Sequence, residues 1–142
     1  MIDSRITESI PHRPPMLLID SIIELGDNSI TCSKTFQPEE FFLQGHFPDR
    51  PIVPGVILCE CAAQAGAVLL LQTGGENSGG TPLLTRINDV RLKQVVEPND
   101  TVEVQVTLDE QVSTAYLMSA KVRKNGKVAA SLKFTCMIQP AE

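Results

Sequence analysis

A sixteen-residue apolar run, VILCECAAQAGAVLLL at 56–71, most constrains how this chain can fold. Only Glu60 and Gln64 are polar within it. A membrane-crossing helix needs about 20 apolar residues, and a carboxylate in the middle of the run makes insertion costly. Pro54 suits a first helical turn and two glycines follow the run, which predicts a helix over about 54–72. Because this helix is apolar on nearly every side, it must be enclosed by protein.

Segments with strand character lie on both sides of this helix and are separated by turn residues. They are 21–25, 29–36, about 83–96, 101–110, 112–124 and 127–138. Residues 101–108 alternate between apolar and polar, which is typical of a strand with one buried face. Asn125-Gly126 is the strongest hairpin signal, and Pro98-Asn99-Asp100 predicts another turn. We expect one α+β domain, 1–142, in which sequence neighbours pair into an antiparallel sheet around the helix.

Composition limits the partners and the location of the protein. A formal net charge of −5 and the lack of a basic block argue against nucleic acid or an anionic membrane as a partner. Charged residues near the amino terminus interrupt any secretory apolar stretch, so a cytoplasmic location is expected. The four cysteines, at 32, 59, 61 and 136, lack zinc-site or disulfide spacing and are predicted to be reduced and buried. The same spacing predicts no metal site, and because no nucleotide, dinucleotide or serine-hydrolase motif occurs, no cofactor is expected.

The loop 44–55, directly before the helix, carries the first candidate functional residue, His46. Its prolines and glycines predict a stiff, irregular backbone that can hold a side chain at a set position. Four phenylalanines lie close by in sequence, at 36, 41, 42 and 47, and are expected to make a dry lining around the imidazole. The alternative is that His46 caps or packs the loop.

Glu60 is the second candidate, because glutamate is seldom buried without a partner. A carboxyl group in apolar surroundings is suited to act as an acid near neutral pH. Gln64 follows one turn later and shares its face, so a polar stripe facing a cleft or a subunit interface is the alternative. Gly55 lets a ligand approach N–H groups at the positive end of the helix dipole, which suits polarising a carbonyl. This set suits proton abstraction beside a carbonyl followed by loss of a β-hydroxyl.

The remaining candidates are weaker. His12 has no acidic neighbour in sequence except distant Asp20, so it is predicted to be structural or a cap. Cys59 and Cys61 lie roughly 200° apart around a helix and cannot easily hold one metal ion.

Three blocks of the sequence resemble the 3-hydroxyacyl-[acyl-carrier-protein] dehydratases of the FabZ family. They are PHRPPMLLID at 11–20, GHFPDRPIVPGV at 45–56, and Glu60 with Gln64. The resemblance covers nearly the whole chain and implies a hot-dog fold, in which an antiparallel sheet wraps one long central helix. It also implies dehydration of a (3R)-3-hydroxyacyl thioester on acyl carrier protein to the trans-2-enoyl product in fatty acid biosynthesis.

The resemblance also implies residue roles. His46 would take the C2 proton, and Glu60, directly or through a water, would help the C3 hydroxyl leave. Gly55 or Val56 would offer a backbone N–H to the thioester carbonyl, with Phe47 and Gln64 beside the substrate. In the family the histidine and the acid come from different subunits, which implies a homodimer, commonly assembled as a trimer of dimers.

Some positions depart from the family pattern. Leu83 replaces the tyrosine that resembles a gate over the acyl tunnel, and Arg86 stands where glycine is usual. A paralogous dehydratase of a specialised lipid or polyketide pathway, a hot-dog thioesterase and a non-catalytic carrier-binding subunit are the alternatives. Because acyl carrier protein is acidic, Arg86, Arg91 and Lys93 are candidate docking residues, with ordinary solvated strand residues as the other interpretation.

Overall fold

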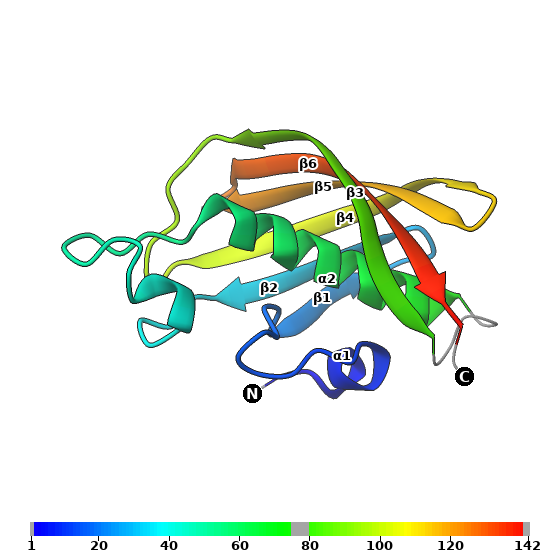
Figure 1. Cartoon of the computed structure of the whole chain (residues 1–142), viewed down its shortest axis with the longest axis horizontal. Coiled ribbons are helices and arrows are strands. Elements are labelled where there is room, and N and C mark those ends of the chain that lie inside the picture. The colour runs from blue at the N-terminus through cyan, green and yellow to red at the C-terminus, as the bar shows by residue number, and fades with distance from the viewer. Residues whose placement is uncertain (1, 75–79, 141–142) are drawn as a thin grey trace.

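A six-stranded antiparallel sheet curves around one long helix in the computed structural model, which describes residues 2–74 and 80–140 (Figure 1). The short helix α1 (Ser4–Ser9) and the 3-10 turn η1 (Phe41–Leu43) lie before the long helix α2 (Gly55–Thr73). The strands are β1 (Ser21–Leu25), β2 (Ser29–Thr35), β3 (Thr81–Leu92), β4 (Thr101–Val112), β5 (Ala115–Lys124) and β6 (Lys127–Gln139). The predicted α+β class, with the sheet around a central helix, is confirmed.

Helix α2 forms the centre of the core. Its length and apolarity match those of a membrane span, but 72% of the apolar stretch is buried within the protein, so the sheet provides its apolar surroundings. It begins one residue later than predicted, because Pro54 takes the N-cap position rather than the first turn. Gly74 is its C-cap, and Gly75 lies outside the described residues. At Gly66 a Cβ atom would lie 2.8 Å from Phe134, so glycine lets the helix approach the sheet closely.

The strand order is β1-β2-β4-β5-β6-β3, so the prediction that sequence neighbours pair throughout is wrong for β3. Strand β2 pairs with β4, with Cys32 opposite Val104, and thereby occupies the edge of β4 that β3 would need. Helix α2 separates β2 from β3 in sequence, and β3 pairs instead with β6, with Ile87 opposite Phe134. Strand β3 also ends at Leu92, earlier than predicted. It therefore forms an edge of the sheet.

The predicted turns and the alternating strand are confirmed. Asn125 and Gly126 have φ of 52° and 79°, as a two-residue hairpin turn of type I′ requires. Asn99 has φ 74°, and its N–H donates to the carbonyl of Phe36 (2.7 Å), which starts β4 beside the end of β2. Alternate residues of β4 are buried, beginning with Val102.

All four cysteines are buried, as predicted, and none is in a disulfide. Burial raises the pKa of the Cys32 and Cys136 thiols to about 12, and raises that of Cys59 and Cys61 as well. These thiols therefore stay protonated at neutral pH and pack as small apolar groups. In the described part of the chain, His, Cys, Asp and Glu side chains form no cluster suited to a metal ion.

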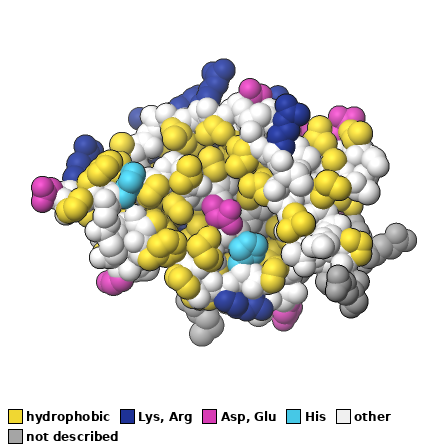
Figure 2. Space-filling model, viewed as in Figure 1, with side chains coloured by type: hydrophobic (Ala, Val, Ile, Leu, Met, Phe, Trp, Pro, Cys, Tyr) yellow, Lys and Arg dark blue, Asp and Glu magenta, His cyan; other side chains and the backbone are white. Residues whose placement is uncertain are grey.

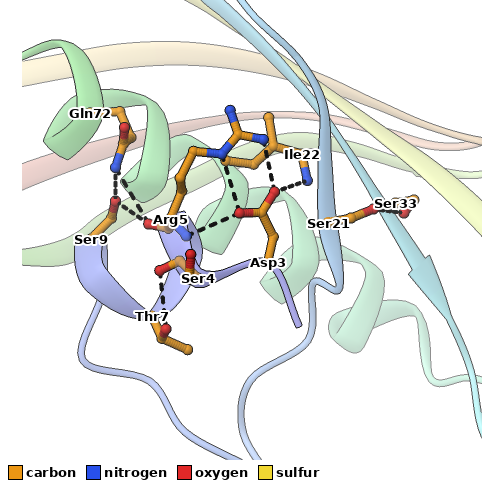
Figure 3. A network of polar contacts seen from close by, with 9 residues as sticks. All are labelled: Asp3, Ser4, Arg5, Thr7, Ser9, Ser21, Ile22, Ser33 and Gln72. Atoms are coloured by element: carbon orange, nitrogen blue, oxygen red, sulfur yellow. Dashed lines mark hydrogen bonds and ion pairs between the residues drawn. The ribbon is translucent and has the colours of Figure 1, made fainter. Parts of the chain in front are cut away.

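Helix α1 is held in place by polar contacts at both of its ends (Figure 3). The Asp3 carboxylate accepts from the backbone N–H of Arg5 (3.0 Å) and from its guanidinium (2.8 Å). These bonds hold the pKa of Asp3 at about 2. At the other end, Gln72 of α2 donates to the hydroxyl of Ser9 (2.6 Å). The chain that leaves α1 toward β1 crosses the middle of α2, where Gln64 binds the backbone of Met16 and Leu18.

Candidate active site

His46 lies in the loop between η1 and α2, and two contacts with Ile52 hold it there. Ile52 donates its N–H to the His46 carbonyl (2.8 Å), and its own carbonyl lies 3.1 Å from Nδ1 of the imidazole. A carbonyl oxygen can only accept, so the ring hydrogen is assigned to Nδ1 and Nε2 keeps its lone pair. The imidazole is therefore oriented to act as a base through Nε2.

The four phenylalanines near His46 in sequence do not gather around its ring. Phe36 is fully buried in the core, edge-on to Phe42 at 6.0 Å between ring centroids. The ring that contacts the imidazole is Phe47, which is stacked at 4.4 Å and is 53% exposed. The predicted dry lining is thus incomplete within the described part of one chain, because Phe36 and Phe42 pack into the core and Phe41 is exposed.

Glu60 and Gln64 share one face of α2, as predicted. Gln64 is 1% exposed and donates from Nε2 to Oε2 of Glu60 (2.8 Å) and to the carbonyl of Met16 (2.7 Å). Its Oε1 accepts from the N–H of Leu18 (2.8 Å). Glu60 itself is only partly buried, with 29% of its side chain exposed, because it faces a cavity of about 80 Å³. Gln64 anchors one oxygen of the glutamate.

The structure also brings His12 to this cavity, which the sequence did not predict. Its Nε2 lies 3.7 Å from Oε2 of Glu60, so the histidine has an acidic neighbour in space that it lacks in sequence. The contact joins residues 48 positions apart, through the chain that crosses α2 before β1. The only sequence signal was the apolar run that follows His12, which had to pack against the long helix. That signal does not say which residue of α2 the histidine meets.

Gly55 lines a different cavity, of about 270 Å³, together with Leu92 and Lys93. A Cβ atom at Gly55 would collide with the side chain of Leu92. The sequence analysis predicted that the space left by the missing side chain would be open to a ligand. Leu92 of β3 fills it instead. Pro54 provides no side-chain cap, and the N–H of Ile57 donates to the Pro54 carbonyl (2.9 Å), which leaves the N–H groups of Gly55 and exposed Val56 available.

His46 and Glu60 belong to two separate places on the chain. Glu60 lies in the second turn of α2 and faces a cavity lined by His12 and by residues of β3 and β6. His46 lies in the loop before the helix and is fastened there to Ile52. Figure 2 shows one histidine against an acidic side chain in the middle of a largely apolar face, and the other histidine well apart from it. Within one chain, the loop histidine and the helix glutamate thus lie apart.

The residues expected to gate the substrate or dock the carrier lie on β3 or just after it. Leu83 is exposed and stands opposite Met137 of β6, beside cavity-lining Pro82. Arg86 and Arg91 are exposed on the same strand, and exposed Lys93 lines the cavity at Gly55.

Comparisons with known proteins identify the family of this chain. The FabA-like domain family matches residues 10–133. The 3-hydroxyacyl-[acyl-carrier-protein] dehydratase FabZ of Rickettsia bellii is 37% identical over 137 residues, which are 96% of this chain and 94% of that protein. The chain belongs to the FabZ family. A second FabZ, from Rickettsia massiliae, is 36% identical over the same shares of both chains. The family suggested by the sequence is confirmed.

Solved structures show the same fold as this FabZ-family chain. The dehydratase heterocomplex ApeI:P from Xenorhabdus doucetiae matches with a TM-score of 0.82 at 22% identity, over 96% of this chain and 91% of the other. A mutant of a hypothetical thioesterase protein from Streptococcus pneumoniae TIGR4 matches with a TM-score of 0.67 at 12% identity, over 85% and 91%. At these identities the likeness shows the fold alone, which is the predicted hot-dog fold.

Proposed function

We propose that this chain, as a single domain, dehydrates (3R)-3-hydroxyacyl thioesters on acyl carrier protein to trans-2-enoyl thioesters in fatty acid biosynthesis. The observation that carries the proposal is the pair of oriented groups in a FabZ-family chain. Nε2 of His46 keeps its lone pair because Nδ1 is bound to Ile52, and Glu60 is anchored through one oxygen by Gln64.

The reaction is a β-elimination that these groups can complete. Nε2 of His46 takes the proton from C2, and the electrons of the C2–H bond form the double bond to C3. The C3–O bond breaks, and the hydroxyl takes a proton from Glu60 and leaves as water. An N–H of Gly55 or Val56 polarises the thioester carbonyl and so makes the C2 proton more acidic. The electron pairs stay within the substrate, so the balance requires no redox cofactor.

We assign the complete site to a homodimer, with His46 from one copy and Glu60 from the other, and propose a trimer of dimers as the full assembly. The free edge of β3 supports the dimer, because an unpaired strand edge is a ready surface for another chain. It carries large apolar side chains that are each between 41% and 57% exposed: Leu83, Leu84, Ile87, Val90 and Leu92. In such a dimer Phe47, Gln64 and Leu83 would lie beside the acyl chain.

The product formed from a 3-hydroxyacyl-carrier substrate tests the activity. Mass spectrometry of the carrier is expected to show the loss of one water from the acyl group. The enoyl product should stay attached to the carrier through its thioester. Release of free acid would instead indicate a thioesterase. Bound but unchanged substrate would indicate a non-catalytic carrier-binding subunit, and either outcome would overturn the proposal.

We further propose that acyl carrier protein docks at the cavity beside Gly55, where Lys93 supplies positive charge. Reversing the charge with Lys93→Glu is expected to raise the KM for carrier-bound substrate about fivefold, because one exposed ion pair is worth up to about 1 kcal/mol. Arg86→Glu and Arg91→Glu should act in the same direction. The matched control is Lys121→Glu, at an exposed position on β5.

The readout for docking is the KM for the carrier-bound substrate against that for a small thioester of the same acyl group. Only the former should change, and rising salt should reduce the difference between the variants and the wild type. An unchanged KM for the carrier-bound substrate in all three variants would contradict the proposed docking surface.

A cytoplasmic location is also proposed. The four cysteines are buried and none forms a disulfide, which suits a reducing compartment. Under this proposal, the enzyme binds its carrier-bound acyl substrates in the cytoplasm.

A further inference from the structure

The segment between α1 and β1 places an unexplained histidine on the acid side of the site. His12 and Glu60 line the same cavity of about 80 Å³, with Nε2 of the histidine 3.7 Å from Oε2 of the glutamate. Within residues 2–74 and 80–140, Nδ1 of His12 is the one buried side-chain nitrogen or oxygen that lacks a hydrogen-bond partner. Burying a polar ring nitrogen without a partner costs free energy, so packing alone does not account for a histidine at this position.

The missing partner indicates which ring nitrogen carries the hydrogen. Buried N–H groups without an acceptor are rarer than acceptors without a donor, so Nδ1 is the bare nitrogen and Nε2 carries the hydrogen. Nε2 is also the ring nitrogen that lies 3.7 Å from Oε2 of Glu60. The separation exceeds an N–H···O hydrogen bond by about 0.5 Å, and catalytic hydrogen bonds are often long without substrate and shorten in the complex.

The two oxygens of Glu60 therefore have different surroundings. Oε2 accepts from Gln64 at 2.8 Å and faces His12 as well. Oε1 has no hydrogen-bond partner in the described part of the chain. Once the contact with His12 shortens in the complex, Oε2 accepts from both N–H groups, so the proton of the acid sits on the other oxygen.

We propose that His12 is a positioning residue which, with Gln64, directs the transferable proton of Glu60 to Oε1. When Oε1 gives its proton to the departing hydroxyl, the negative charge that forms on the carboxylate is stabilised at Oε2 by two N–H donors. The inference rests on the proposed dehydration and adds to it an assignment of the donating oxygen. His12 acts through Glu60 and does not itself exchange a proton with the substrate.

Three substitutions separate this role from packing. The amide nitrogen of His12→Gln reaches the place of the imidazole Nε2, whereas that of His12→Asn matches Nδ1 and falls short of Glu60. His12→Ala removes both nitrogens. We expect the kcat on a 3-hydroxyacyl thioester to fall about tenfold to a hundredfold for Ala and Asn, a part of the 10²–10⁴ that a general acid supplies. The KM should stay within about twofold, and Gln should recover kcat to within about fivefold of the wild type.

A 3-fluoroacyl thioester provides the second readout. Its elimination still needs the base at C2, but fluoride leaves without a proton from Glu60. The loss of kcat in His12→Ala is therefore expected to shrink to less than about threefold on this substrate. The loss of kcat in Glu60→Gln should also be smaller on the 3-fluoroacyl thioester, because this variant lacks only the acid.

Each outcome decides the inference. Equal losses on both substrates, or equal activities of the Gln and Asn variants, would show that His12 only packs the cavity. If the wild-type protein dehydrates the thioester and all three variants are equally active, the role of His12 would be overturned and the proposed function would stand. A wild-type protein without dehydratase activity would overturn the proposed function and this inference together. Thermal unfolding of each variant checks folding, and if His12→Ala is unfolded the Gln and Asn pair decides.

Discussion

Mixing His46→Ala subunits with Glu60→Gln subunits is expected to restore activity that neither variant has alone. Each variant homodimer lacks the base or the acid at both of its sites, so kcat should fall at least about a thousandfold. In a mixed dimer, one site receives both intact groups and the other receives neither. Random association at equal amounts makes half of the dimers mixed, so the steady-state rate should return to about a quarter of that of the wild type.

The matched control is a chain carrying both substitutions, mixed with the wild-type chain. If each site is shared between subunits, both sites of this mixed dimer lack one group, and it adds nothing to the activity of the remaining wild-type dimers. If one chain instead supplies both groups, this second mixture keeps active sites and the first mixture stays inactive. Native mass spectrometry of subunits with different tags must show exchange in both mixtures. Exchange without recovery in the first mixture would contradict the shared site.

Replacing Gln64 with leucine is expected to cause the largest loss of stability on the polar face of α2. The side chain is buried, and it joins the helix to the backbone of Met16 and Leu18 and to Glu60. Leucine is of similar size but leaves the Leu18 N–H and the Met16 carbonyl without partners. The free energy of unfolding should fall by about 3 kcal/mol, since each unsatisfied buried group costs about 1–3 kcal/mol. Urea unfolding monitored by circular dichroism measures it.

The control for this substitution is Gln72→Leu, on the same helix. Gln72 is exposed and donates to Ser9 of α1 at the surface, so water can replace its contact. Its loss should stay below about 0.5 kcal/mol. Equal losses in the two variants would mean that helix propensity or general packing, rather than the buried hydrogen bonds, sets the effect at position 64.

Features that depend on neighbouring residues could be predicted from the sequence. The apolar run 56–71 required an enclosed helix, because its composition leaves no polar face wide enough for solvent. The period of that helix placed Glu60 and Gln64 together, as the hydrogen bond of 2.8 Å confirms. Asn125-Gly126 formed the predicted hairpin turn because both residues tolerate positive φ.

Features that depend on contacts between distant segments could not be predicted from the sequence. Nothing local to β3 says that it pairs with β6, because the edge of β4 is taken by a strand from before the helix. Leu92 fills the space beside Gly55 only because β3 passes the start of α2, which replaces the open approach expected from the glycine.

The sequence by itself determined the central helix, the antiparallel strands and which residues are the candidate base and acid, because periodicity and residue chemistry act over a few residues. Only the tertiary structure decided what surrounds those groups. It fastened His46 to Ile52, so that Nε2 is the basic atom. It also set His12 beside Glu60 across 48 residues of sequence. These contacts depend on where the whole chain packs around α2, and no short stretch of sequence contains that information.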